Sequence, residues 1–287
     1  MEVVKSVPVN GKMNALTIDV EEWFQVTNLR ERISCEQWDQ CESRILVNMA
    51  RILRLLSLAK VRATFFILGW IAEKKPEVVQ LIHDGGHEIA THGYSHRSIT
   101  ELSPEEFRIE IEKSVALLEK ITGQKVIGFR APNYSINSDT IWAFNILTET
   151  GIKYDSSIFP VKHDRYGFLT APRLPFFIDL KEQGELIEFP LSTIRVCGTN
   201  IPVAGGAYLR LYPYWFIRLA IKRLNSSGKP AIIYFHPWEI DAGQPRVELS
   251  FISKFRHYGN LLMTERKLSK LLKDFEFGPV RDVLGLN

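Results

Sequence analysis

The sequence is poor in cysteine and in long apolar runs. Its 287 residues include only three cysteines, Cys35, Cys41 and Cys197. An odd number at spacings that match no zinc-ribbon pattern argues against a disulfide framework and against a cysteine-bound metal. No segment approaches the roughly 18 apolar residues that span a bilayer, and the N-terminal region has no uninterrupted apolar stretch typical of a secretory signal. We therefore expect no transmembrane segment and a cytoplasmic location, with the inner face of the membrane as an alternative.

Long runs of one charge are also missing. The formal net charge is +3, and lysine and arginine never form more than short clusters. A nucleic-acid tract or a polybasic membrane patch would need a stronger local excess of positive charge. Nucleic acid is not an expected partner, and the sequence does not predict the oligomeric state.

No internal repeat, low-complexity tract or flexible linker interrupts the chain. Residues 1–13 carry no recognisable pattern, so we expect a poorly ordered extension, and Met13 is a second candidate start. From residue 14 onward, short apolar runs alternate with amphipathic stretches. This arrangement predicts a single domain over residues 14–287.

The alternation predicts strands followed by helices. The clearest helix begins after Ser103, which can cap it, with Pro104 at its first position and Glu106 completing a capping box. Repeated strand–helix units predict a mostly parallel sheet, either closed as a barrel or open and doubly wound. The expected strands are residues 14–20, 63–68, 87–91, 125–129, 152–155, 190–197 and 231–235. The other expected helices are residues 43–57, 76–83, 138–148, 213–224 and 262–274.

Polar residues follow five of the predicted strands where each one ends. In both candidate architectures the active site collects at the carboxyl ends of parallel strands. We therefore expect these side chains to share one site. They are Asp19 with Glu21 and Glu22, His92 with His96, Arg130, Asp155, and His236.

A histidine pair is the strongest sign of chemistry. His92 and His96 can reach one ion if the segment between them turns, and a carboxylate from another strand would complete a three-ligand site with open positions. In an extended segment Asp19 and Glu21 share a face while Glu22 points away. The alternatives are a histidine pair on a solvated face and an acidic strand end without a ligand role.

Five short motifs occur in an order that resembles a known family. They are TIDVE at 17–21, THGYSH at 91–96, FRAPNYS at 129–135, YDSS at 154–157 and IIYFHP at 232–237. Each motif is weak alone, but the ordered set resembles the polysaccharide deacetylases, carbohydrate esterase family four, also called the NodB-homology domain. The resemblance implies a distorted (β/α) barrel with mostly parallel strands.

Further stretches resemble the members of that family associated with bacterial exopolysaccharide biosynthesis. They are CESR at 41–44, ATFFILGW at 63–70, GGAYLRLYP at 205–213 and HPWEID at 236–241. The similarity then covers nearly the whole chain, with a region particular to this subfamily from about residue 200.

The family resemblance also implies a role for each motif residue. Glu21, His92 and His96 would hold a divalent ion, usually zinc. Asp19 would be the general base. The remaining implied roles are Arg130 orienting Asp19, His236 as general acid and Asp155 steering the imidazole of His236.

Two motifs depart from the commonest family pattern. An adjacent pair of aspartates is replaced by Asp19-Val20-Glu21, so Glu22 remains an alternative carboxylate ligand. Asn133 stands where tyrosine is common, although the backbone N–H after Pro132 can still stabilise an oxyanion. The candidate substrate-binding residues are Trp23, Asn133, Tyr134, Arg210 and Trp238.

Other conspicuous residues have ordinary explanations. We interpret His87 as a structural histidine, because it lies at the beginning of its predicted strand. His163 and Asp164 lie in a loop and either contact substrate or cap a turn. Gly205 and Gly206 indicate either a close backbone approach or a turn.

The sequence as a whole predicts a metal-dependent hydrolase that removes N-acetyl groups from an acetamido sugar. A bound cation brings the pKa of water to about 7, and a general base and a general acid then serve attack and departure of the amine. The substrate would be an N-acetylated glycan or its lipid- or nucleotide-linked precursor. The alternatives are an amide or imide hydrolase acting on a small molecule and an inactive glycan-binding protein.

Overall fold

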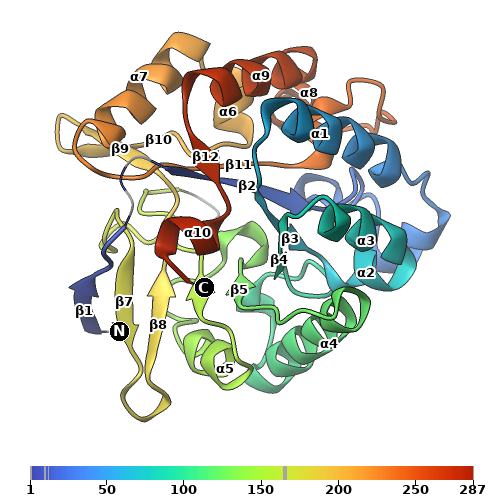
Figure 1. The fold of residues 1–287 in the computed structure, drawn as a ribbon. Coiled ribbons are helices and arrows are strands. Elements are labelled where there is room, and N and C mark those ends of the chain that lie inside the picture. The colour runs from blue at the N-terminus through green and yellow to red at the C-terminus, as the bar shows by residue number, and fades with distance from the viewer. Residues whose placement is uncertain (1, 10, 12, 164–166, 287) are drawn as a thin grey trace.

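The computed structural model describes residues 2–9, 11, 13–163 and 167–286. Its centre is a curled ten-stranded sheet with the order β1-β7-β8-β6-β5-β4-β3-β2-β11, and β12 also pairs with β2 (Figure 1). The strands from β8 to β11 along this order are parallel, whereas β7 pairs antiparallel with both of its neighbours, β8 and β1. The strands of this sheet are β1 (Glu2–Ser6), β2 (Asn14–Val20), β3 (Thr64–Ile67), β4 (Glu88–Thr91), β5 (Gly128–Phe129), β6 (Tyr154–Asp155), β7 (Phe176–Asp179), β8 (Glu185–Glu188), β11 (Ile232–Phe235) and β12 (Phe277–Gly278).

Most of the helices surround the sheet on its outer side (Figure 1). The predicted cap is present at the longest of them, where the Ser103 hydroxyl accepts from the Glu106 N–H and the Glu106 carboxylate accepts from the Ser103 N–H. The helices are α1 (Ile45–Ala59), α2 (Gly69–Lys74), α3 (Pro76–Asp84), α4 (Pro104–Thr122), α5 (Ala143–Glu149), α6 (Ala207–Leu211), α7 (Tyr214–Asn225), α8 (Phe251–Tyr258), α9 (Thr264–Asp274) and α10 (Val280–Leu284). Within the described ranges, none of these helices combines the length and apolar character needed to cross a membrane.

Residues 191–205 bridge the gap between β8 and β11. The N–H of Val203 donates to the Ser192 carbonyl at 3.0 Å, and the N–H of Tyr234 on β11 donates to the Ala204 carbonyl at 2.8 Å. Gly205 forms a parallel bridge with Tyr234. These backbone hydrogen bonds complete the wall of a distorted barrel, as the sequence predicted.

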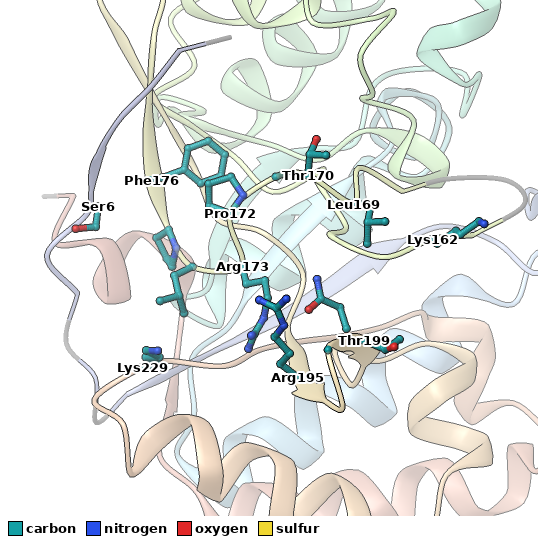
Figure 2. A pocket seen from close by; sticks show the side chains of 15 residues that line it. Ser6, Lys162, Leu169, Thr170, Pro172, Arg173, Phe176, Arg195, Thr199 and Lys229 are labelled. Atoms are coloured by element: carbon teal, nitrogen blue, oxygen red, sulfur yellow. The ribbon is translucent and has the colours of Figure 1, made fainter.

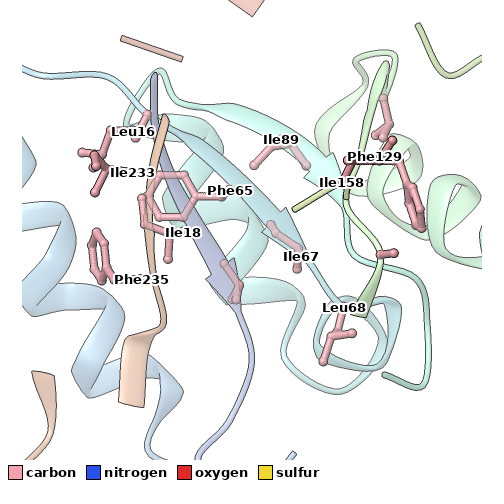
Figure 3. Packing of buried hydrophobic residues seen from close by; sticks show 14 of the residues in the cluster. Leu16, Ile18, Phe65, Ile67, Leu68, Ile89, Phe129, Ile158, Ile233 and Phe235 are labelled. Carbon is pink, nitrogen blue, oxygen red and sulfur yellow. The ribbon is translucent and has the colours of Figure 1, made fainter. Parts of the chain in front are cut away.

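Alternation along β2 sends side chains to two different environments. Leu16 and Ile18 belong to the apolar cluster between sheet and helices (Figure 3). Ala15 belongs to a second cluster inside the barrel. Because side chains alternate along a strand, Thr17 and Asp19 share the interior face with Ala15. The barrel interior is thus where β2 presents its carboxylate.

Two strands differ from those that the sequence predicted. Glu2–Ser6, in the N-terminal extension where no strand was expected, forms β1, whose backbone pairs with β7. Residues 190–197 were expected in the parallel sheet, but β9 (Thr193–Val196) forms an antiparallel hairpin with β10 (Thr199–Pro202) instead. The reason is local, since both turn residues, Cys197 and Gly198, have the positive φ that a tight hairpin turn requires.

Candidate active site

Five of the eight polar residues predicted to share a site border one cavity of about 650 Å³, whereas Glu22, Arg130 and Asp155 are not in its lining. It opens where β2, β4, β5 and β11 end. From the sequence-predicted set, its lining includes Asp19, Glu21, His92, His96, Asn133, Tyr134, Arg210, His236 and Trp238.

Glu21, His92 and His96 form the one group among the described residues with the geometry of a metal site. One ligand atom from each residue lies within 4.8 Å of the others, and all three side chains are buried. Strand β4 delivers both histidines, and the chain just beyond β2 delivers the carboxylate. His96 has a positive φ of 57°, which turns the segment after β4 so that both rings face Glu21.

The orientation of His92 is fixed by a backbone group. Its Nδ1 lies 2.8 Å from the carbonyl oxygen of Arg130, so Nδ1 carries the hydrogen and Nε2 keeps its lone pair. Burial lowers the pKa of His92 to about 4. A neutral ring with Nε2 free is the form that ligates a metal.

Glu21 is held as a carboxylate. Burial raises its pKa, but the neighbouring His96 and His236 outweigh that effect and lower it to about 2. Its Oε1 accepts from the indole N–H of Trp238 at 2.9 Å. Its Oε2 is buried and accepts no well-formed hydrogen bond, although Nε2 of His96 lies only 2.8 Å away.

This unsatisfied oxygen fits a bound cation. Two acceptor lone pairs facing each other in a buried site repel, unless a proton or an ion lies between them. Two imidazoles and one carboxylate are the ligand set of a catalytic zinc site with an open position. The residues present therefore fit the divalent ion that the sequence predicted.

Glu22 points away from this cluster. Its carboxylate accepts from the Ser43 hydroxyl and from the backbone N–H groups of Arg44 and Ile45, at the first turn of α1. A carboxylate at a helix N-terminus satisfies N–H groups that have no partner within the helix. The structure thus places Glu21, not the alternative Glu22, beside the histidines.

Asp19 is held by a fully buried arginine. Nη1 of Arg130 donates to Asp19 Oδ1 at 2.6 Å and to the Thr17 hydroxyl at 2.8 Å. Its other two nitrogens donate to the carbonyl and hydroxyl of Ser156. The Tyr134 hydroxyl lies 3.3 Å from Asp19 Oδ2. Four contacts hold the guanidinium still, so the position of Asp19 is fixed relative to Glu21.

His236 faces the carboxylates from the end of β11. Its Nε2 lies 3.5 Å from Glu21 Oε1 and 3.9 Å from Asp19 Oδ2. Its Nδ1 lies 2.8 Å from Glu239 Oε2. Burial lowers the pKa of His236, but the negative charges of Glu21 and Glu239 outweigh that effect and raise the pKa to about 9. The ring is therefore an imidazolium at neutral pH.

Asp155 does not contact His236, which corrects the sequence prediction. Its carboxylate accepts from the hydroxyl of Ser157, which in turn accepts from the Ala131 N–H at 2.7 Å. Asp155 thus supports the chain around Arg130 from beneath the site. Glu239 holds the imidazole instead, and its spacing of three residues from His236, typical of a capping box, was the signal in the sequence.

Two predicted substrate-binding residues are also structural. Trp23 is buried against Phe24, and its indole N–H donates to the Glu42 carbonyl at 2.9 Å. Arg210 borders the cavity but is buried, and its Nε donates to Glu239 Oε1 at 2.6 Å. Its other nitrogens donate to backbone carbonyls of α8 and the following turn, so it cannot clamp a ligand.

The other three candidates remain at the cavity. Trp238 stacks on His236 with 5.2 Å between ring centroids. Asn133 has a positive φ of 58°, and its side-chain amide donates to the Ser98 hydroxyl. Tyr134 presents its hydroxyl to Asp19. These three residues line the cavity beside Asp19 and His236.

The structure also places two further histidines that the sequence analysis considered, His87 and His163. His87 accepts from the Ala63 N–H through Nδ1 at 3.2 Å, as expected of a structural histidine. His163 lines the cavity. Asp164 lies outside the described residues.

Comparison with known proteins identifies two matching regions. Residues 38–154 match the polysaccharide deacetylase family model, and residues 156–285 match a domain of unknown function, DUF3473. A Helicobacter pylori peptidoglycan deacetylase is 32% identical over 191 residues, which is 63% of this chain and 60% of that protein. A peptidoglycan deacetylase-like protein of Gibberella zeae is 38% identical over 114 residues, which is 39% of this chain and 33% of that protein.

The fold has solved counterparts. One is the crystal structure of a protein described as a putative polysaccharide deacetylase from Mycobacterium smegmatis. It superposes on this chain with a TM-score of 0.62 at 19% sequence identity. The match covers 99% of this chain and 94% of that one. The chain thus has the fold of these deacetylases, although it spans only about a third to three fifths of the curated relatives' length. The ordered motifs, the family model and this fold agree, and residues 38–154 are a region of the polysaccharide deacetylase family type.

Proposed function

We propose that this protein is a metal-dependent hydrolase that removes N-acetyl groups from an acetamido sugar of a bacterial glycan. One observation carries the proposal. Glu21, His92 and His96 converge within 4.8 Å of one another, with Asp19 and His236 directly beside them. Binding alone does not require a carboxylate and an imidazolium poised at a metal site.

The ligand set favours zinc. Glu21, His92 and His96 would hold the ion, which when bound supplies Lewis acidity and a water molecule with a pKa near 7. His92 is pre-oriented for this role by the Arg130 carbonyl. The hydrogen bond from Nδ1 of His92 to this carbonyl fixes the tautomer of His92 that leaves Nε2 free for a metal ion.

Asp19 is the proposed general base. Its Oδ1 accepts from Arg130, whereas Oδ2 faces the cavity, with the Tyr134 hydroxyl at 3.3 Å and Nε2 of His236 at 3.9 Å. A carboxylate with one oxygen anchored and the other available can accept a proton from water at a defined place. The pairing with Arg130 keeps the acceptor in that position through the cycle.

His236 is the proposed general acid. The amine released from an amide is a poor leaving group until it gains a proton. His236 is protonated at neutral pH because Glu21 and Glu239 favour its charged form, and Nε2 is the nitrogen that faces the site. The backbone N–H of Asn133 is the candidate donor to the oxyanion.

We further propose that the substrate belongs to exopolysaccharide biosynthesis, either as the N-acetylated glycan or as its lipid- or nucleotide-linked precursor. The support is the resemblance of residues 41–44, 63–70, 205–213 and 236–241 to the proteins associated with that process. The location we propose is the cytoplasm or the inner face of the membrane.

The test is acetate release from three substrate classes. Purified protein loaded with zinc would be incubated with N-acetylglucosamine oligomers, a UDP-linked sugar and a lipid-linked sugar. We expect acetate from at least one class and loss of about a hundredfold or more in Asp19→Asn. No acetate from any class, with metal bound, would favour the amide or imide hydrolase. Unchanged turnover in Asp19→Asn would contradict the assigned base.

A further inference from the structure

A second cavity of about 870 Å³ lies beside the β9–β10 hairpin and shares no lining residue with the active site (Figure 2). Residues 169–176 leading into β7, the hairpin itself and the turn before β11 form most of its lining, to which Ser6 and Lys162 also contribute. Its size falls in the range of small-molecule sites. The cavity is therefore a distinct place where a ligand could bind.

Positive charge dominates the lining of this second cavity. Its charged residues are Lys162, Arg173, Arg195 and Lys229, and no aspartate or glutamate of the described chain lines it. Figure 2 shows the side chains of Arg173 and Arg195 close together at its centre. A concave surface lined by one sign of charge concentrates ions of the opposite sign.

The two arginines differ in how they are held. Nε and Nη2 of Arg173 donate to the hydroxyl and carbonyl of Thr193 at 3.1 and 3.2 Å, which fixes the guanidinium and leaves Nη1 available. Arg195 is exposed, and no side-chain hydrogen bond or ion pair joins it to another described residue. Burial lowers the pKa of Arg173, and the charges of Arg195 and Arg223 lower it further. Positive charge accumulates here without a described carboxylate to balance it.

One wall of the second cavity is apolar. Leu169, Pro172, Leu174 and Phe176 line it together with the cations. An inorganic anion would leave this wall unused, whereas an ester with an organic group would cover it. Several positive charges in one cavity favour a ligand that carries more than one negative charge. A guanidinium group can donate two parallel hydrogen bonds to the oxygens of one phosphate.

We propose that this second cavity binds the diphosphate group of an organic diphosphate ester. Arg173 and Arg195 would contact the phosphate oxygens, with Lys162 and Lys229 at the flanks. The apolar wall would contact the organic part, which is either a nucleoside or a lipid chain. The proposal does not depend on the deacetylase activity, because it concerns a separate cavity.

The position of the cavity links it to the active site. Lys162 lines the second cavity, and the next residue, His163, lines the active-site cavity. Adjacent Cα atoms are about 3.8 Å apart, so one short loop borders both spaces. A diphosphate ester bound here would lie next to the glycan site.

The experiment is calorimetric titration of the full chain with inorganic pyrophosphate, UDP and farnesyl diphosphate, the last kept below its micelle concentration. We expect saturable 1:1 binding of at least one probe, weakened at least tenfold by Arg195→Gln and by Lys162→Gln. Arg195 and Lys162 are exposed, so their replacement spares the fold. Arg266→Gln on α9 is the matched control, since it removes one exposed positive charge elsewhere, and its affinity should stay within twofold of wild type.

The comparison of probes identifies the source of the diphosphate. Tighter binding of UDP than of pyrophosphate assigns a nucleotide, and tighter binding of farnesyl diphosphate assigns a lipid. Either of these two results supports the proposal, whereas equal affinities for all three probes would show that the apolar wall contributes nothing and would overturn the assignment of an organic ester. The absence of saturable binding of every probe would overturn it, as would equal weakening by Arg195→Gln and Arg266→Gln.

Discussion

Glu239 Oε2 lies 2.8 Å from Nδ1 of His236, and Glu239 Oε1 lies 2.6 Å from Nε of Arg210. One buried carboxylate therefore contacts both the imidazole of the active site and Arg210, whose other nitrogens donate to backbone carbonyls of α8 and the turn after it. Burial raises the pKa of Glu239, but His236 and Arg210 outweigh that effect and lower it to about 2. Glu239 is a positioning residue that favours the protonated form of His236.

Replacing Glu239 by glutamine should move the pH dependence of activity. The neutral amide keeps an acceptor for Arg210 but removes the negative charge that raises the pKa of His236. Since the general acid must be protonated, the alkaline limb of kcat should shift to lower pH, and kcat at pH 8 should fall about tenfold or more. A pH–rate profile of Glu239→Gln against wild type measures this. A lower kcat with the alkaline limb unmoved would indicate a purely structural role.

Adjacent glutamates provide a matched pair for the metal site. Glu21→Gln should weaken zinc binding by at least about tenfold, the size seen even for loss of outer-shell partners. Glu22→Gln should leave zinc affinity unchanged and lower the free energy of unfolding by about 1 kcal/mol, because Glu22 serves the N-terminus of α1. Zinc titration and denaturant unfolding of both variants distinguish the two roles. The reverse pattern would move the ligand assignment to Glu22.

His257 makes stability depend on pH. It is completely buried beneath Trp238, with 4.6 Å between the ring centroids, and burial, aided by Arg210, lowers its pKa from 6.5 to about 3. The unfolded chain thus binds a proton that the folded chain does not, so stability falls as pH drops from about 6.5 towards 3.

Between pH 7.5 and pH 5 this one group should lower the free energy of unfolding by about 2 kcal/mol. His257→Phe keeps a stacked ring without a titrating group, so its unfolding free energy should change by about 2 kcal/mol less over that interval. Urea unfolding at the two pH values measures the difference. Identical pH dependences in both proteins would show that His257 does not titrate as described.

Gly205 is required where the barrel wall closes. Its φ is 149°, and an added Cβ would lie 1.8 Å from the Tyr234 carbonyl oxygen. The backbone on both sides is fixed by the bridge to β11, so Gly205→Ala should cost at least about 3 kcal/mol. Gly123→Ala is the control, since φ is 67° but nothing lies within 4 Å, and it should cost about 1–2 kcal/mol. Similar losses of thermal stability in both variants would contradict the close approach.

Much of the fold could be predicted because local signals agreed with tertiary structure. Residues 14–20 formed the predicted strand, and the capping box at Ser103 began the predicted helix. The antiparallel strands β1 and β7 were missed because their pairing is set by distant partners rather than by local pattern. The β9–β10 hairpin was missed because cysteine is an unusual residue at a turn with positive φ.

The candidate site shows the same division. The face shared by Asp19 and Glu21 followed from strand geometry, and the structure brings both beside the histidines. The neighbours of Asp155 and Arg210 could not be predicted, because each lies between elements far apart in the sequence. Arg210 meets α8 and Glu239, while Asp155 meets the loop after β5 through Ser157.

The most direct test of the central claim is to titrate zinc into chelator-treated protein and to measure bound metal and acetate release from N-acetylglucosamine oligomers in the same samples. The account predicts no turnover without metal, activity that rises in proportion to bound zinc, and a plateau at one ion per chain. Acetate release at full rate from metal-free protein, or a plateau unchanged in Glu21→Gln, would contradict it.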